Sequence, residues 1–271
     1  MPSTYAHKRF GELVFEKLPA QMQEKIEKHK TAFYLGLHGP DILFYYKPLS
    51  KNSNRKKGLD MHFAPAKNFF LPTAKTLVAQ NEDPLETAAG AYAAGFICHF
   101  GLDDACHGDI YKLEDTGVSH GKIESEFDKY LLRENGLKIA GYNPAKHLNS
   151  ENGTASAAAL LLNESEDVLK SAIKTIRTIN GMFVSRSYLF HGLAHLVLKI
   201  AKMDRKFGDM FLHKKDDPRC SECNVVLAQN MKNAVEPTAA LVQEYFENLN
   251  QIAENGEMNK IFNKDFTGDK L

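Results

Sequence analysis

Metal-ligating residue types recur at four-residue intervals near the middle of this chain. His99, Asp103 and His107 stand at i, i+4 and i+8 within AAGFICHFGLDDACHGD, and His120 and Glu124 repeat the i, i+4 step thirteen residues later. On a helix, residues four apart project from one face, so an imidazole and a carboxylate placed this way can bind one divalent ion. A single such pair is common on helices that bind nothing, but two pairs in one segment favour a metal site built on helices.

The same spacing argues for more than one ion. A rise of about 1.5 Å per residue separates His99 from His107 by roughly 12 Å along a helix, whereas metal–nitrogen bonds are only about 2 Å long. One ion cannot easily reach both rings. Asp103 lies halfway between them, and its two oxygens could bridge an ion held by His99 to another held by His107. We therefore expect a multinuclear site.

The remainder of the sequence predicts an all-α protein. Apolar residues recur at three- and four-residue spacing and strand signals are sparse, so we expect a single-domain multi-helix bundle over residues 1–271 with a metal cleft. Asp83-Pro84 is a helix start signal, and Gly108 is placed to end the helix that follows. Helices are expected near 4–18, 21–38, 66–80, 84–107, 120–133, 165–181, 182–206 and 224–254. Irregular segments are expected at 35–58, 108–121 and 141–156, and the tail after about residue 255 is expected to be loosely attached.

Charge and targeting signals narrow the possible partners and compartment. Lys plus Arg equals Asp plus Glu at 34 each, so no global field attracts nucleic acid or an anionic membrane. Residues 1–19 lack the apolar run of a signal peptide, and no segment is long enough to span a bilayer. We expect a cytoplasmic protein of undetermined oligomeric state. The four cysteines, of which Cys220 and Cys223 form a single CxxC, are interpreted as reduced thiols.

Three further ligand candidates precede the helix pairs. They are His7 in TYAHKRFG, Asp41 in GPDILFYY and His62 in GLDMHF, and each alone is a weak signal. In chain order the full set reads His7, Asp41, His62, His99, Asp103, His107, His120 and Glu124. This ordered set, within residues 1–130, resembles the zinc-dependent phospholipase C family, including its small non-secreted bacterial branch, and more distantly the zinc-dependent single-strand nucleases.

The resemblance implies an all-helical bundle that holds three zinc ions at the bottom of a cleft. It assigns Asp41, His62, His99 and Asp103 to one zinc, His107, His120 and Glu124 to a second, and His7 with a bridging Asp103 to the third. In the family the third zinc also binds the main chain of the mature N-terminal residue, usually a tryptophan. This chain has no Trp, and removal of Met1 would instead expose Pro2. We expect two to three zinc ions, although iron or manganese would suit the same ligands.

Such a cluster suits phosphodiester hydrolysis. Zinc lowers the pKa of its bound water to about 7, and paired ions clamp the attacking and leaving oxygens of an in-line displacement. Asp41 is the candidate catalytic residue that orients or deprotonates the water, and a purely ligating role is equally compatible. We expect a small phosphodiester or a phospholipid head group as substrate, with peripheral membrane contact left open.

Two alternatives remain. One is a nuclease or nucleotide phosphohydrolase that uses the same metals, although neutral net charge argues against long nucleic acids. The other is a metal-stabilised binding protein without turnover, in which every coordination position is filled by protein. His191 and His195 form another i, i+4 pair, but their strongly apolar flanks favour buried, hydrogen-bonded histidines.

Overall fold

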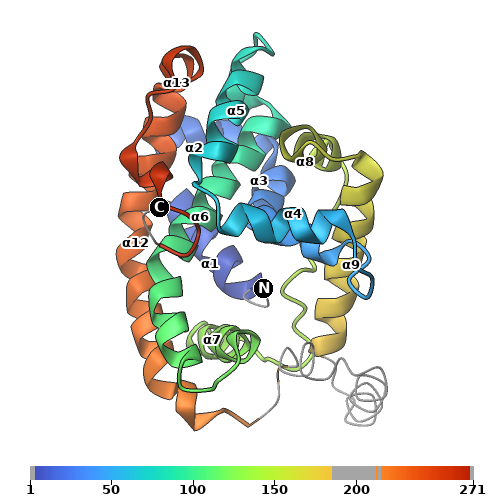
Figure 1. Ribbon diagram of the computed structural model, residues 1–271, viewed down its shortest axis with the longest axis vertical. Coiled ribbons are helices and arrows are strands. Elements are labelled where there is room, and N and C mark those ends of the chain that lie inside the picture. Colours follow the sequence, from blue (N-terminus) through green and yellow to red (C-terminus); the bar gives the residue numbers. More distant parts are fainter. Residues whose placement is uncertain (1–3, 185–211, 213–214, 269–271) are drawn as a thin grey trace.

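The computed structural model describes residues 4–184, 212 and 215–268. These residues form helices and loops without a β-sheet, which confirms the predicted all-α fold (Figure 1). The α-helices are α1 (Thr4–Phe15), α2 (Ala20–Lys28), α3 (Lys30–Gly36), α4 (Ser53–His62), α5 (Lys67–Val78), α6 (Ala88–Glu114), α7 (His120–Glu134), α8 (Thr154–Leu162), α9 (Glu166–Phe183), α12 (Ser221–Glu247) and α13 (Leu249–Asn255). Short 3₁₀ helices include η1 (Gly39–Tyr45), η2 (Pro84–Glu86), η4 (Pro218–Cys220) and η5 (Lys260–Asn263).

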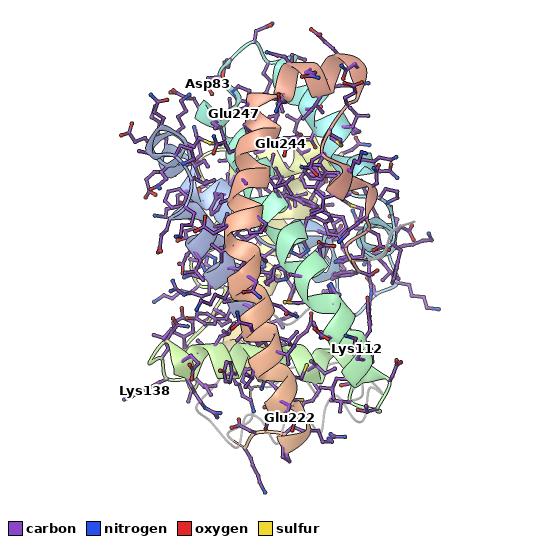
Figure 2. All side chains as sticks on the ribbon, turned by 90° about the vertical axis from the view of Figure 1, so that its left-hand side faces the viewer. Asp83, Lys112, Lys138, Glu222, Glu244 and Glu247 are labelled. Atoms are coloured by element: carbon purple, nitrogen blue, oxygen red, sulfur yellow. The ribbon has the colours of Figure 1, made fainter. Side chains whose placement is uncertain are left out.

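Helix α6 is the central element, and α1, α3, α7, α8 and α12 all pack against it. Figure 2 shows α12 beside α6, with α7 crossing near the lower ends of both helices. The Thr87 side chain accepts a hydrogen bond from the Gly90 N–H at 3.0 Å and caps the start of α6. A Cβ atom on Gly95 would lie 2.1 Å from the Phe33 carbonyl oxygen. The missing side chain therefore lets α3 approach α6 closely, and η1, which follows α3, comes near the metal-ligand candidates of α6.

The predicted end of the central helix at Gly108 is wrong, because α6 continues to Glu114. Gly108 has a helical backbone with open space around it, whereas Gly117 adopts φ +89°, the left-handed conformation that suits glycine after a helix. The chain then turns and α7 begins at His120. This turn brings the ring of His120 to 5.5 Å from the ring of His107, measured between centroids.

Other boundaries also differ from the prediction. The segment 21–38 divides into α2 and α3 at His29, and segment 35–58, expected to be irregular, contains η1 and most of α4. Asn52 caps α4 by accepting a hydrogen bond from the Arg55 N–H at 2.9 Å. Helix α8 also begins inside the expected irregular segment 141–156. Most of the predicted helix 182–206, including His191 and His195, lies outside the described residues.

The prediction of a loosely attached tail after about residue 255 is wrong. Phe262 and Phe266 are each only 1% exposed, and both rings pack against Phe100 of α6. The last described residues therefore belong to the hydrophobic core, because their aromatic rings cover Phe100 of α6. None of the helices in the described part of the chain is long and apolar enough to cross a membrane.

Candidate metal centre

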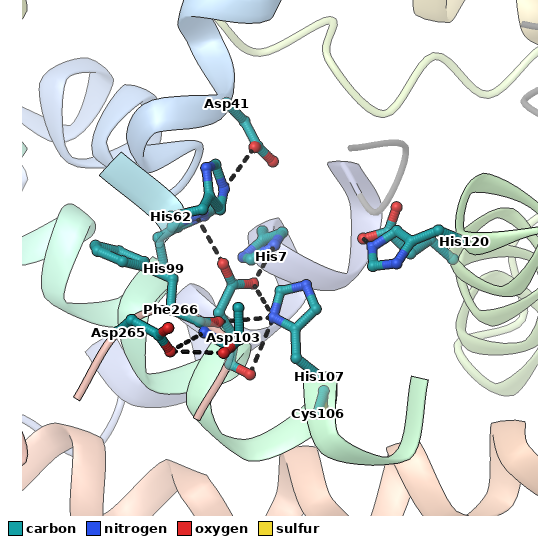
Figure 3. A network of polar contacts seen from close by, with 12 residues as sticks. His7, Asp41, His62, His99, Asp103, Cys106, His107, His120, Asp265 and Phe266 are labelled. Carbon is teal, nitrogen blue, oxygen red and sulfur yellow. Dashed lines mark hydrogen bonds and ion pairs between the residues drawn. The ribbon is translucent and has the colours of Figure 1, made fainter. Parts of the chain in front are cut away.

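The fold brings all eight sequence-predicted ligands to one region, where the N-terminal part of α1, η1 and the ends of α4 and α7 converge on α6 (Figure 3). The described residues contain three groups in which the possible ligand atoms lie within 4.8 Å of one another. The groups are His7, Asp41 and His99; His62, His99 and Asp103; and His107, His120 and Glu124. His99 belongs to two of the groups, so the first two sites adjoin.

The Asp103 carboxylate lies between two imidazoles. Its Oδ2 is 3.1 Å from Nε2 of His99, and its Oδ1 is 3.4 Å from Nε2 of His7. The nearest nitrogen of His107 is Nδ1, at 3.8 Å. Asp103 therefore faces His7 and His99, as the family resemblance implies, and not the pair of His99 and His107 expected from helix spacing, because the first helix inserts His7 beside α6.

Asp41 and His62 approach the same centre from η1 and α4. The Oδ1 atom of Asp41 lies 3.1 Å from Nε2 of His62. Gly39, at φ +44°, makes this approach feasible, because a Cβ there would stand 2.3 Å from Cδ2 of the His99 ring. The glycine thus serves both the turn and the close contact with a ligand candidate.

Three imidazoles use Nδ1 to contact a backbone carbonyl. The distances are 2.7 Å from His62 to the Gly58 oxygen, 3.2 Å from His99 to the Leu37 oxygen, and 2.8 Å from His107 to the Phe266 oxygen. A carbonyl can only accept, so each Nδ1–H donates, and in the neutral ring Nε2 keeps its lone pair. This is the arrangement of metal-binding histidines, in which the second nitrogen fixes the tautomer.

Several buried atoms in the centre have no partner in hydrogen-bond geometry. They are Nδ1 of His7, Oδ1 of Asp41, Nε2 of His99 and Oδ2 of Asp103. Folded proteins rarely leave buried polar atoms unsatisfied, and here acceptors face acceptors at the distances given above. Divalent cations in the two adjoining ligand groups would supply partners for these atoms, so the residues fit the zinc that the sequence predicts.

Burial and neighbouring charges set suitable protonation states. Burial, reinforced by His99, lowers the pKa of His7 to about 3, so the ring is neutral at pH 7. Burial opposes ionisation of Asp103, but the imidazoles of His99 and His107 hold the pKa of this carboxyl well below its usual range. Neutral imidazole and ionised carboxylate are the forms that bind metal.

The third group lies across the centre, on α6 and α7. Nε2 of His120 is 3.4 Å from Oε1 of Glu124, and Nδ1 of His120 is 3.2 Å from Oε2 of Glu114. The rings of His107 and His120 stack with their planes 23° apart. Glu124 is 4% exposed, so this carboxylate too is withdrawn from water.

Sequence reasoning missed the residues that support these ligands. The carboxylate of Asp128 on α7 accepts hydrogen bonds from the N–H groups of Tyr5 and Ala6, at 3.1 and 2.8 Å, and so anchors the turn that carries His7. Burial raises the pKa of Asp128 to about 8.

Phe266 also supports a ligand, because its backbone carbonyl accepts a hydrogen bond from the His107 ring. A backbone carbonyl leaves no signal in the sequence. His38 is not among the predicted ligands, yet it is only 3% exposed. Pro2 lies outside the described residues.

Comparison with known proteins identifies the family. A family model described as zinc dependent phospholipase C matches residues 6–179, which is more than half of the chain and includes all eight candidate ligands. Neither a curated protein nor a solved structure matches the chain. On the evidence of that match, the chain belongs to the zinc-dependent phospholipase C family.

Proposed function

We propose that this protein is a zinc-dependent phosphodiester hydrolase of the phospholipase C type, acting on a small phosphodiester or a phospholipid head group. The observation that carries the proposal is the set of buried, unpartnered acceptor atoms on His7, Asp41, His99 and Asp103. Membership of the family supports hydrolysis of phosphoric esters. The three ligand groups support a cluster of two to three ions, and His99 belongs to two of these groups.

Bound zinc would polarise the phosphoryl group and acidify water. The protein keeps the His7 ring neutral and Asp103 ionised, which are metal-binding forms, and it removes the ligands from bulk water, which strengthens their charge interactions. Asp41 is 7% exposed and turns Oδ1 toward His62. We assign it the additional role of orienting, or accepting a proton from, the attacking water.

The substitution Asp41→Asn distinguishes activation of water by Asp41 from zinc ligation alone. For Asp41→Asn, loss of general-base catalysis lowers kcat by about 10²- to 10⁴-fold while most of the zinc stays bound. If zinc falls in proportion to activity, Asp41 only ligates. Asp60→Asn is the matched control, because this carboxylate lies on α4 and pairs with Lys56 at the surface.

The substrate class is tested with a water-soluble phosphodiester, its monoester, a phosphatidylcholine micelle and a single-stranded oligonucleotide. The proposal expects diester or phospholipid cleavage that chelation abolishes and zinc restores. Cleavage of the oligonucleotide alone would assign the protein to the nuclease alternative. Bound zinc without turnover of any ester would favour a binding protein.

Exposed apolar side chains near the metal centre support a phospholipid as the substrate. Leu59 and Phe63 are 50% and 56% exposed, and they flank His62 at the end of α4. Leu49, in the loop before α4, is 74% exposed. If these residues contact lipid, Phe63→Ser will lower cleavage of micellar phospholipid more than cleavage of the soluble diester.

A further inference from the structure

The C-terminal residues contact two of the ligand-bearing elements at once. The N–H of Phe266 donates to the His62 carbonyl oxygen at 3.1 Å, and the Phe266 carbonyl accepts from Nδ1 of His107 at 2.8 Å (Figure 3). One peptide segment thereby joins the end of α4 to the middle of α6. It lies far outside residues 6–179, which the family model matches.

Residues 264–267, here called the C-terminal strap, are held at Lys264 and shaped by an internal turn. The Lys264 carbonyl accepts from the Ala66 N–H at 2.9 Å, and its ammonium pairs with Asp104 of α6 at 2.7 Å. Oδ1 of Asp265 accepts from the N–H of Thr267 at 2.8 Å and from its hydroxyl at 2.6 Å. These last two bonds form a turn that closes around Phe266 and sets the direction of its carbonyl.

The Phe266 side chain packs against ligand rings of the same two elements, α4 and α6. Its ring is buried and lies 5.7 Å from the ring of His62 and 6.0 Å from that of His99, between centroids. Phe96 and Phe100 surround it from α6. The strap therefore combines a polar bond to one ligand ring with apolar contacts to two others.

We propose that the C-terminal strap is a positioning element of the metal centre. Its Phe266 carbonyl, at 2.8 Å the nearer of two carbonyls that face Nδ1 of His107, holds the imidazole as the Nδ1–H tautomer; the other, that of Asp103, lies at 3.2 Å. Nε2 is then directed to the group that contains His120 and Glu124. The inference rests on the proposed zinc function. Removing an outer hydrogen bond from a ligating histidine commonly weakens metal binding by about 10- to 100-fold.

The contacts predict a selective effect. The strap bonds to the His107 ring itself, whereas it reaches His62 through the main chain. Loss of the strap therefore weakens the ion of the His107, His120 and Glu124 group first. A residue needed only for folding would instead lower the stability of the metal-free protein without singling out one ion.

The principal test compares Asp265→Ala with Asp265→Asn in the full chain. The alanine removes the acceptor of the Thr267 bonds and lets the Phe266 carbonyl turn away, whereas asparagine keeps an oxygen there and should rescue the wild-type behaviour. Zinc retained per chain is measured against a chelator series, with thermal unfolding in excess chelator as the stability control. A chain that ends at Asn263 gives the larger perturbation, and one that ends at Gly268 is its control.

The expected result is a 10- to 100-fold weaker affinity for one ion in Asp265→Ala and in the chain ending at Asn263. The other ions stay, and Asp265→Asn and the chain ending at Gly268 match wild type. Equal affinities in all proteins, or a uniform loss of every ion together with lower metal-free stability, would overturn the strap proposal. Its failure is distinguishable from that of the proposed function, because a zinc-loaded wild type that cleaves no ester contradicts only the latter.

Discussion

The His7 ring of α1 stacks on the His99 ring of α6, with centroids 4.3 Å apart and planes 21° apart. Two imidazoles from distant parts of the chain can stack in a buried place only if at least one is neutral. The lowered pKa of His7 meets that requirement. The contact couples the first helix to the central helix at the metal centre, so the position of α1 bears directly on metal binding.

Replacing His7 should remove part of the cluster. For His7→Asn we expect about one zinc fewer per chain, because the group with Asp41 and His99 loses one of its three ligands. Metal content by elemental analysis measures this directly. His29→Asn is the control, since the His29 ring contacts the Glu86 carbonyl and belongs to none of the ligand groups in the described part of the chain. Unchanged zinc in His7→Asn would contradict the assignment.

Asp103→Asn should lower total metal content more than any other single change. Its two carboxylate oxygens face His99 and His7, and an amide supplies only one weaker, uncharged oxygen. Asp109→Asn, two turns further along α6, is the matched control because Asp109 pairs with Lys112 and Asn230 outside the centre. Wild-type zinc stoichiometry in Asp103→Asn would count strongly against a ligand shared between ions.

The spacing of ligands along the sequence determines only part of this site. The i, i+4 rule placed His99, Asp103, His120 and Glu124 correctly on helix faces, because residues four apart on a helix are neighbours whatever the tertiary fold. It failed for the partner of Asp103. No spacing within α6 encodes that His7, almost a hundred residues away, packs beside it.

The fold was predictable to a similar extent. Helical periodicity identified α5, α7 and α9 closely, but it missed two short helices without a clear amphipathic pattern. These are α4, which is mostly polar, and α8, which is mostly Ala and Leu. The C-terminal strap was interpreted as a loose tail because its sequence has no amphipathic period. Its order comes from long-range contacts, such as the Ala66 N–H bond to the Lys264 carbonyl, which local sequence does not encode.

Gly39→Ala should disturb the centre beyond the cost of backbone strain. The new Cβ would overlap the His99 ring, and φ +44° is unfavourable for alanine. Gly136→Ala supplies the matched control, because it has φ +69° but nothing within 4 Å. We expect about 1 kcal/mol of destabilisation for the control and about 3 kcal/mol for Gly39→Ala, with weaker zinc binding. Equal losses in urea unfolding would show that the His99 contact is absent.

Acid should destabilise the metal-free protein partly through His147. Burial, reinforced by His38, lowers the pKa of His147 to about 3, so between about pH 3 and 6.5 the unfolded chain binds a proton that the folded chain does not. Stability therefore falls as pH falls. From pH 7 to pH 5 the loss is about 1 kcal/mol after allowance for partial solvent screening of the ring.

His147→Gln should reduce that acid loss. The measurement is the free energy of unfolding at pH 7 and pH 5, in urea with excess chelator, so that metal release does not contribute. If wild type and His147→Gln lose the same stability over this interval, the His147 ring does not stay neutral in the folded state.

The most direct test of the central claim is elemental analysis of the purified protein, run beside hydrolysis of a soluble phosphodiester with and without chelator. We predict two to three zinc ions per chain and diester cleavage that disappears on chelation and returns with zinc. A protein without bound metal, or one whose cleavage persists after complete metal removal, would contradict it.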